Sequence, residues 1–335
     1  MLRQKNVLTG FFLCFILFLV FTFANSLLTA AGDAILLYTS QPDADAQALI
    51  KAFTAKNPAI QVNFFRSGTE EVISKIMAEN QSGKIQADVL LVADSVTFEI
   101  LKRQNLLEAY QSPETKKIAA QFIDADHMYT GTKIIATVLG VNTKNAKKMP
   151  DSWQILTEPL SRNQGIMPSP LYSGAAAYNL GILTRQKSFG WNFYRKLKEN
   201  GMTTVQGNGA VLKALATGDK TYGMVVDYMV ARAKQDGSPV DLVYPREGVT
   251  AVTEPVGIVK NTPNLAAARK FVDYVLSVDG QNLAASINYT PVRKGVKAPQ
   301  GLKAAAQIKV LSSPTSDLYN TRDEEKKKFS DLFGL

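Results

Sequence analysis

The sequence predicts an α/β protein with two lobes, each a sheet covered by helices. Three observations favour this fold class. Strands and helices alternate in two separate stretches of the chain, as in sheets with helices on their faces. Two long extended segments, 132–142 and 250–260, bracket the second stretch and predict two strands that cross between the lobes. The chain has 335 residues, 46% of them hydrophobic, which is enough for two cores.

The first residues have the pattern of an export signal. Arg3 and Lys5 precede an apolar run over 7–23, and small residues follow up to Gly32. We therefore expect residues 1–32 to be a cleaved signal peptide, with an uncleaved membrane anchor as the alternative. Cys14, the one cysteine, lies within the run and is followed by Phe15, so a lipoprotein is not indicated. A mature chain without cysteine has no disulfide, thiolate metal site or cysteine nucleophile.

The next stretch predicts a parallel sheet. Strands are expected over 34–38, 60–65 and 88–92, and helices over 43–56, 69–82 and 95–103. This order requires crossover connections and hence parallel strands. Ligands bind such sheets beyond the carboxyl ends of the strands. The candidate binding residues there are Ser40, Ser67, Gly68, Thr69 and Ser95.

The alternation then begins again. Strands are expected over 165–167, 222–226 and 240–243, and helices over 153–156, 175–184, 191–200, 211–216 and 229–234. Two more helices follow, over 264–277 and 279–287. We assign 33–132 and 257–300 to lobe 1, 133–256 to lobe 2, and 301–335 to a C-terminal helical segment. Within that segment, the mixed charges at 323–328 predict a solvated helix face.

A Ser-Gly turn before the helix at 175–184 is the strongest candidate anion site. The first N–H groups of a helix lack partners and carry partial positive charge, so Ser173, Gly174 and Ala175 could hold an anion. An ordinary capped helix is the alternative. A second copy, at Ser67-Gly68-Thr69, is expected to be weaker because two glutamates follow it, although Arg66 would help.

Several function classes are excluded or disfavoured. The net charge is +9, but no basic stripe alternates with aromatic residues, so we expect no nucleic-acid partner. No Walker loop, H-E-x-x-H or G-x-G-x-x-G is present. Asp124, Asp126 and His127 could ligate a metal, but a solvated turn is favoured. We expect no enzyme activity, no metal and no cofactor.

Several segments together resemble periplasmic solute-binding proteins of ABC importers. They are 168–175, 207–219, 222–227, 254–260 and 264–280, and their order and spacing carry the resemblance. The similar branch holds binders of ferric iron, hexose phosphates and aminoethylphosphonate. The resemblance implies the type II two-lobed fold with two crossing hinge strands and a periplasmic location. It also implies a small anionic solute and an inner-membrane permease as partners, and we expect a monomer.

The residues after strand 222–226 decide between ligands within this branch. Ferric-binding members carry two adjacent tyrosines there, whereas this chain has Asp227, Tyr228 and Met229. Methionine is a poor ligand for a hard cation. We therefore expect a phosphate- or phosphonate-bearing solute, with Asp227 and Glu254 accepting hydroxyls or an amine. The structural alternatives are a helix cap for Asp227 and a lysine-paired hinge carboxylate for Glu254.

Two other functions stay open at this point. One is a ferric-iron binding protein that uses Tyr228. The other, from a different class, is a secreted phosphate-ester hydrolase, although Ser67 and Ser173 have no evident histidine partner.

Overall fold

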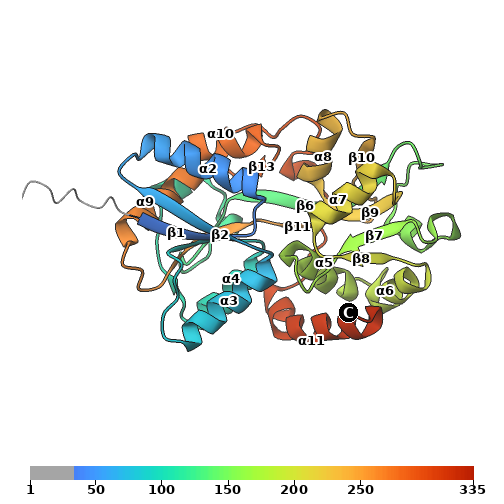
Figure 1. Cartoon of the computed structure of the whole chain (residues 1–335), viewed down its shortest axis with the longest axis horizontal. Helices are drawn as coiled ribbons and strands as arrows, with labels where there is room; N and C mark the ends of the chain where they lie inside the picture. Colours follow the sequence, from blue (N-terminus) through green and yellow to red (C-terminus); the bar gives the residue numbers. More distant parts are fainter. Residues whose placement is uncertain (1–33) are drawn as a thin grey trace, which may run out of the picture.

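The computed structural model describes residues 34–335. The predicted signal peptide and Cys14 lie outside the described residues. Within residues 34–335, no helix is both long and apolar enough to span a membrane. The described chain forms two sheets with helices packed around each, as expected (Figure 1).

Lobe 1 is built on the first sheet. β1 (Ala34–Thr39) pairs in parallel with β2 (Gln61–Arg66) and β3 (Val89–Leu91), which confirms the expected parallel order. β12 (Pro255–Val259) joins β3 in antiparallel fashion and also pairs with β4 (Leu107–Glu108) and β5 (Thr130–Gly131). Its helices are α2 (Asp43–Lys56), α3 (Thr69–Gln81), α4 (Ser95–Arg103), α9 (Leu265–Leu276) and α10 (Val278–Ser286).

Lobe 2 is built on the second sheet, whose strand order is β10-β6-β9-β7-β8. These strands are β10 (Val240–Val243), β6 (Lys133–Asn142), β9 (Tyr222–Val226), β7 (Gly165–Pro168) and β8 (Thr203–Val205). Its helices are α5 (Gly174–Arg185), α6 (Gly190–Glu199), α7 (Asn208–Thr217) and α8 (Asp227–Gln235). Short 3-10 turns lie at Pro113–Lys117, Ala120–Phe122, Trp153–Thr157, Pro159–Ser161 and Ala305–Gln307.

Burial follows the hydrophobic runs of the central strands. Every residue of β3, β6, β9 and β12 is buried, because helices cover both faces of these strands. One core around Phe53 and Phe271 fills lobe 1, and one around Trp153 and Phe193 fills lobe 2.

The chain crosses between the lobes at the two expected strands and at one further place. β6 is the first crossing. The second is β11 (Thr250–Val252) followed by β12, and it is not continuous as expected: Glu254 interrupts it with a φ of 37°. After β13 (Thr290–Pro291), which pairs with β6, the chain crosses a third time to reach α11 (Thr315–Phe333). Residues 292–314 have no periodic pattern from which this crossing could be predicted.

The predicted solvated face at 323–328 is only partly right. Glu324, Lys327 and Lys328 are exposed, but Lys326 and Glu325 form ion pairs with Glu70 and Arg185. A helix turns by about 100° per residue, so a run of charges spreads over several faces. Because α11 packs on α5, α6 and α4, part of this run of charges is covered.

Candidate functional site

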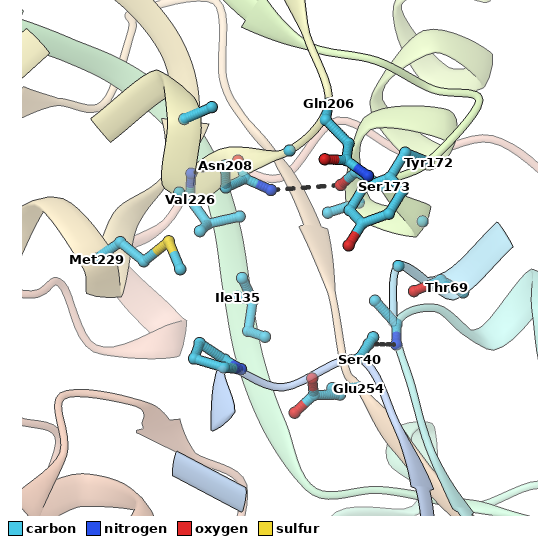
Figure 2. Close-up of a pocket in the computed structure, with 18 of the residues that line it drawn as sticks. Ser40, Thr69, Ile135, Tyr172, Ser173, Gln206, Asn208, Val226, Met229 and Glu254 are labelled. Carbon is cyan, nitrogen blue, oxygen red and sulfur yellow. Dashed lines mark hydrogen bonds between the residues drawn. The ribbon is translucent and has the colours of Figure 1, made fainter. Parts of the chain in front are cut away.

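A cavity of about 240 Å³ lies between the two lobes, at the carboxyl ends of strands from both sheets (Figure 2). The residues after β1, β2 and β3 line one side, and those after β7, β8 and β9 line the other. The volume is near the small end for ligand sites, which suits a metabolite-sized solute. Of the candidate binding residues, the cavity is lined by Ser40, Gly68, Thr69, Ser173, Gly174, Ala175, Tyr228 and Glu254.

Four helices begin at this cavity. The first residues of α3, α5 and α7 are among its lining residues, and so are the second and third residues of α8, Tyr228 and Met229. Each helix start presents N–H groups without helical partners and the positive end of the helix dipole. Helices from both lobes therefore direct positive potential into the same space, which favours a negatively charged group there.

The Ser173 hydroxyl is oriented by two donors. Its Oγ accepts hydrogen bonds from the Ala176 N–H and from Asn208 Nδ2, each at 3.3 Å. A hydroxyl oxygen accepts two bonds and donates one. Because the two lone pairs are engaged, and no acceptor for the hydroxyl proton is present among residues 34–335, that proton is available to an acceptor in the cavity.

Arg66 supplies a cationic group to the cavity lining. Its Nε donates to the Gln41 carbonyl at 2.9 Å, and its Nη1 donates to the Tyr172 hydroxyl at 3.3 Å. These bonds fix the guanidinium beside the starts of α3 and α5. The Arg66–Tyr172 bond also joins the two lobes directly.

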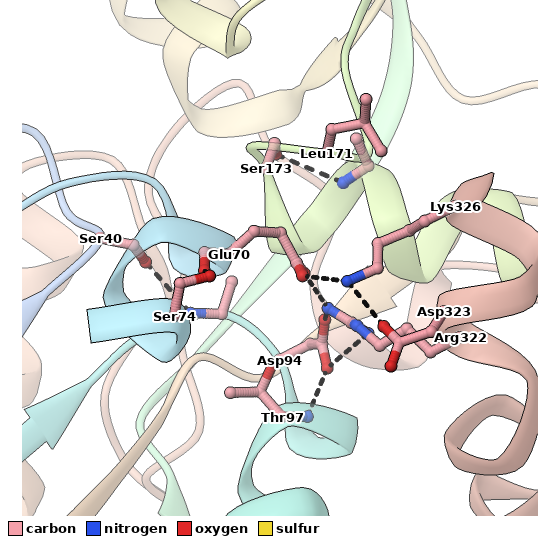
Figure 3. Close-up of polar contacts among 12 residues, drawn as sticks. Ser40, Glu70, Ser74, Asp94, Thr97, Leu171, Ser173, Arg322, Asp323 and Lys326 are labelled. Atoms are coloured by element: carbon pink, nitrogen blue, oxygen red, sulfur yellow. Dashed lines mark hydrogen bonds and ion pairs between the residues drawn. The ribbon is translucent and has the colours of Figure 1, made fainter. Parts of the chain in front are cut away.

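The expected repulsion by the glutamates of α3 is offset. Glu70 turns away from the cavity and forms ion pairs with Arg322 at 2.6 Å and Lys326 at 2.8 Å (Figure 3). Burial favours the neutral form of Glu70, but the two cations outweigh it and lower its pKa. Glu71 instead accepts a hydrogen bond from Ser67. Neither glutamate lines the cavity, so the α3 start remains suited to an anion.

Glu254 places a carboxylate at the other end of the cavity. It is 3% exposed, and its Oε2 bonds to Lys133 Nζ at 2.6 Å and to Gln41 Nε2 at 3.0 Å. The lysine-paired hinge carboxylate, considered as an alternative, is therefore what the structure contains. Its Oε1 has no hydrogen-bond partner within residues 34–335 and belongs to a residue that lines the cavity. A hydroxyl or amine group on a solute could donate a hydrogen bond to this oxygen.

The environment of Tyr228 disfavours a phenolate. Its ring packs on that of Tyr289 with centroids 4.1 Å apart, and burial raises its pKa well above the ordinary value. Met229, next to it, lines the cavity with a thioether. Among the residues that the structure describes, no three His, Cys, Asp or Glu side chains gather as metal ligands.

The acidic turn at 124–127 holds a lysine. Asp124 and Asp126 pair with Lys102 at 2.6 and 2.8 Å, and His127 occupies the turn with a φ of 57°. The arrangement is thus a turn held by an ion pair.

Three candidate residues do not reach the cavity. The Ser67 hydroxyl points to Glu71, and Ser95 lies at the start of α4, which Asp94 caps by accepting from Thr97 N–H. Asp227 is buried: Oδ1 accepts from the N–H groups of Ala136 and Tyr228, and Oδ2 accepts from the Tyr244 hydroxyl. Asp227 therefore joins α8 to β6, and we withdraw the expectation that it contacts the solute.

Several lining residues were not predicted from the sequence as binding residues, among them Tyr172, Gln206, Asn208 and Met229. Asn208 had the appearance of a turn residue, but it starts α7 and links three elements: its Oδ1 accepts from Val226 N–H at 3.2 Å, and its Nδ2 donates to Ser173. An asparagine at a helix start was the available signal. Tyr172 lay within the Ser-Gly motif, whereas nothing in the sequence marked Gln206.

Comparisons with known proteins agree with this architecture. Residues 85–313 match a family described as bacterial extracellular solute-binding protein, and the chain belongs to that family. A probable ABC transporter periplasmic-binding protein, y4fP of Sinorhizobium fredii, is 23% identical, and the alignment covers 89% of this chain and 87% of that protein.

Two solved structures share the fold. The periplasmic binding protein AfuA of Actinobacillus pleuropneumoniae, with fructose-6-phosphate bound, has a TM-score of 0.82 at 24% identity. Iron-bound HitA of Pseudomonas aeruginosa has a TM-score of 0.79 at 24% identity. Each comparison covers 90% of this chain and 99% of the other. The chain is thus a solute-binding protein of the ABC-importer type with the type II fold.

Proposed function

We propose that this protein captures a small molecule bearing a phosphate or phosphonate group and delivers it to an inner-membrane permease. The observation that carries the proposal is the convergence of the starts of α3, α5 and α7, from both lobes, on one cavity. The Ser173 hydroxyl and Arg66 add donors for the same group. A relative of the same fold is described with fructose-6-phosphate bound.

The remainder of the solute would meet the opposite end of the cavity. There Glu254 offers an acceptor and Ser40 a hydroxyl, which suits a sugar alcohol or an amine. The predicted signal peptide and the family's extracellular character support a periplasmic location for the protein. We further propose that it works as a monomer, with closure of the two lobes around the solute.

The alternative functions receive less support. HitA is described as iron-bound, but the buried phenol of Tyr228 and the thioether of Met229 suit Fe³⁺ poorly. A hydrolase would need an activated nucleophile. Ser173 is engaged as a helix cap, and His127, the one histidine of the chain, does not line the cavity.

Thermal denaturation and isothermal titration with a defined panel of compounds test the proposal. The panel contains fructose 6-phosphate, 2-aminoethylphosphonate, inorganic phosphate, ferric citrate and, as the neutral control, fructose. At least one phosphorylated or phosphonylated compound should stabilise the fold by about 3 kcal/mol at a hundredfold excess over Kd. Fructose should have no effect, and no phosphate should be released.

Two results would contradict the proposal. One is binding of fructose as tight as that of any anionic compound. The other is a visible phenolate-to-iron absorption band with ferric citrate that disappears in Tyr228→Phe.

A further inference from the structure

A buried group of charges joins α11 to lobe 1. Arg322 is 6% exposed and Asp94 0%. Arg322 Nη2 lies 3.0 Å from Asp94 Oδ2 and 2.6 Å from Glu70 Oε1, and Lys326 Nζ lies 2.8 Å from Glu70 Oε2 (Figure 3). We call these four residues the interlobe ion cluster. Two cations thus meet two carboxylates from the starts of α3 and α4.

The helix that carries Arg322 and Lys326 is anchored in lobe 2. Phe329 and Phe333 belong to the lobe 2 core, where the Phe329 ring contacts that of Tyr194. Arg185 of α5 pairs with Glu325 at 2.5 Å and donates to the Asp317 carbonyl at 2.9 Å. Arg322 and Lys326 therefore move with lobe 2, whereas Asp94 and Glu70 move with lobe 1.

The cluster lies directly behind the cavity wall. Asp94 follows Ala93, and Glu70 follows Thr69; Ala93 and Thr69 both line the cavity. The lobes are in close contact here, because a Cβ added at Gly174 would lie 2.7 Å from the Ala93 carbonyl oxygen. This closeness is typical of a closed arrangement of the two lobes.

Separation of the lobes at this point has an electrostatic cost. Buried charges are tolerated when they are paired, and removal of the partner leaves an uncompensated charge. If α11 moved away with lobe 2, Asp94 and Glu70 would lose their cations, and water would have to replace them. Separation of the lobes thus replaces well-oriented ion pairs with hydration of the separated charges.

We propose that the interlobe ion cluster is a latch that forms as the lobes close and sets the population of the closed form. None of its four residues lines the cavity, so it acts on the solute only through the position of the lobes. The latch depends on the fold and not on which solute binds.

Distance measurements between two spin labels test the latch. Labels are attached at Gln47→Cys on α2 and Lys213→Cys on α7, which are exposed positions on opposite lobes. The full chain is used with Cys14→Ser, which removes its one native cysteine. Pulsed electron paramagnetic resonance, recorded without solute, then gives the distribution of distances between the two labels. In Arg322→Met, the ratio of short to long distances should fall by about threefold or more.

Arg185→Met is the matched control. It removes the ion pair between Arg185 of α5 and Glu325 of α11, both on the lobe 2 side. Phe329 and Phe333 still hold α11 in the lobe 2 core, so the distance distribution should stay unchanged. If Arg322→Met does not fold, Lys326→Met takes its place, since Lys326 is more accessible. An unchanged distribution in a folded cluster variant would overturn the proposal. An equal shift in the control would also overturn it, because general loosening of α11 would then be the cause.

Discussion

Asp227 shows how a single carboxylate can be misassigned from sequence. It follows a strand that leads to the cavity, yet its oxygens accept hydrogen bonds from Ala136 and Tyr228 N–H groups and from the Tyr244 hydroxyl. Ala136 is 91 residues away in the chain, so no local pattern could reveal the contact. Burial outweighs these bonds and raises the pKa of Asp227 to about 7.

The raised pKa predicts a pH-dependent stability. Between about pH 4 and 7, the native state binds the Asp227 proton more tightly than the unfolded chain does. The contribution of Asp227 to the free energy of unfolding should therefore fall as pH rises through this window, by at most about 1.4 kcal/mol per pH unit. Urea denaturation of the protein and of Asp227→Asn measures this as a difference. A difference that stays constant from pH 4 to 7 would disprove the assigned titration.

Glu254 contrasts with Asp227, because both of its expected roles are compatible with the structure. Sequence reasoning identified a hinge carboxylate that either pairs with a lysine or faces a solute. One oxygen pairs with Lys133, while the residue also lines the cavity. The two roles belong to different oxygens of one side chain, which a sequence cannot separate.

At the scale of elements, the start of α5 is the feature that sequence predicted best. The proline, serine and glycine pattern located the helix start, and Ser173 caps it by accepting from Ala176 N–H. The helix lengths and most strands followed from hydrophobic periodicity. The three-residue β8 and the break at Glu254 did not, since neither contains enough residues to establish a period.

The α5 start also carries a prediction on binding. If the Ser173 proton is donated to an anionic head group, Ser173→Ala should weaken binding of the phosphorylated or phosphonylated compound that binds in the proposed panel by about 1.5–3 kcal/mol, or roughly tenfold to a hundredfold. Isothermal titration well below the melting temperature measures this, because loss of the cap also destabilises the helix. Ser67→Ala is the control, since Ser67 does not line the cavity. Equal affinities of Ser173→Ala and Ser67→Ala would show that Ser173 does not contact the solute.

At the scale of the whole molecule, Gly68 is a contact between lobes. Its φ of −62° is available to any residue, so its backbone does not require glycine. A Cβ there, however, would lie 2.5 Å from the Tyr172 carbonyl oxygen and 2.7 Å from its ring. The absence of a side chain is what allows α3 and the Tyr172 turn to meet.

Gly68→Ala should therefore hinder closure while each lobe stays folded. We expect the affinity for the anionic compound that binds in the proposed panel to fall about tenfold or more, with a small change in melting temperature. Gly209→Ala is the control, because it adds a methyl group to a residue of the same cavity where no atom beyond its chain neighbours and its own helix backbone lies within 4 Å. Small-angle scattering should show that an excess of this compound contracts the control and not Gly68→Ala. Normal contraction of Gly68→Ala would contradict this account.

The lobed architecture was predictable because it depends on the order of elements, which a sequence displays directly. The third crossing and the interlobe ion cluster were not. Arg322 and Asp94 are 228 residues apart, and neither lies in a local sequence pattern that predicts the contact. Such contacts arise only after the elements have taken their places, so composition and spacing do not contain them.

The break at Glu254 ties the choice of solute to the mechanics of the hinge. The same residue has the unusual φ of 37°, separates β11 from β12, and contributes to the cavity surface. A replacement that adapts the cavity to a different solute also relaxes or tightens the joint about which the lobes turn. A substitution of Glu254 that changes the ligand preference therefore also changes the angle between the two lobes in the absence of solute. Evolution would have to adjust these two properties together.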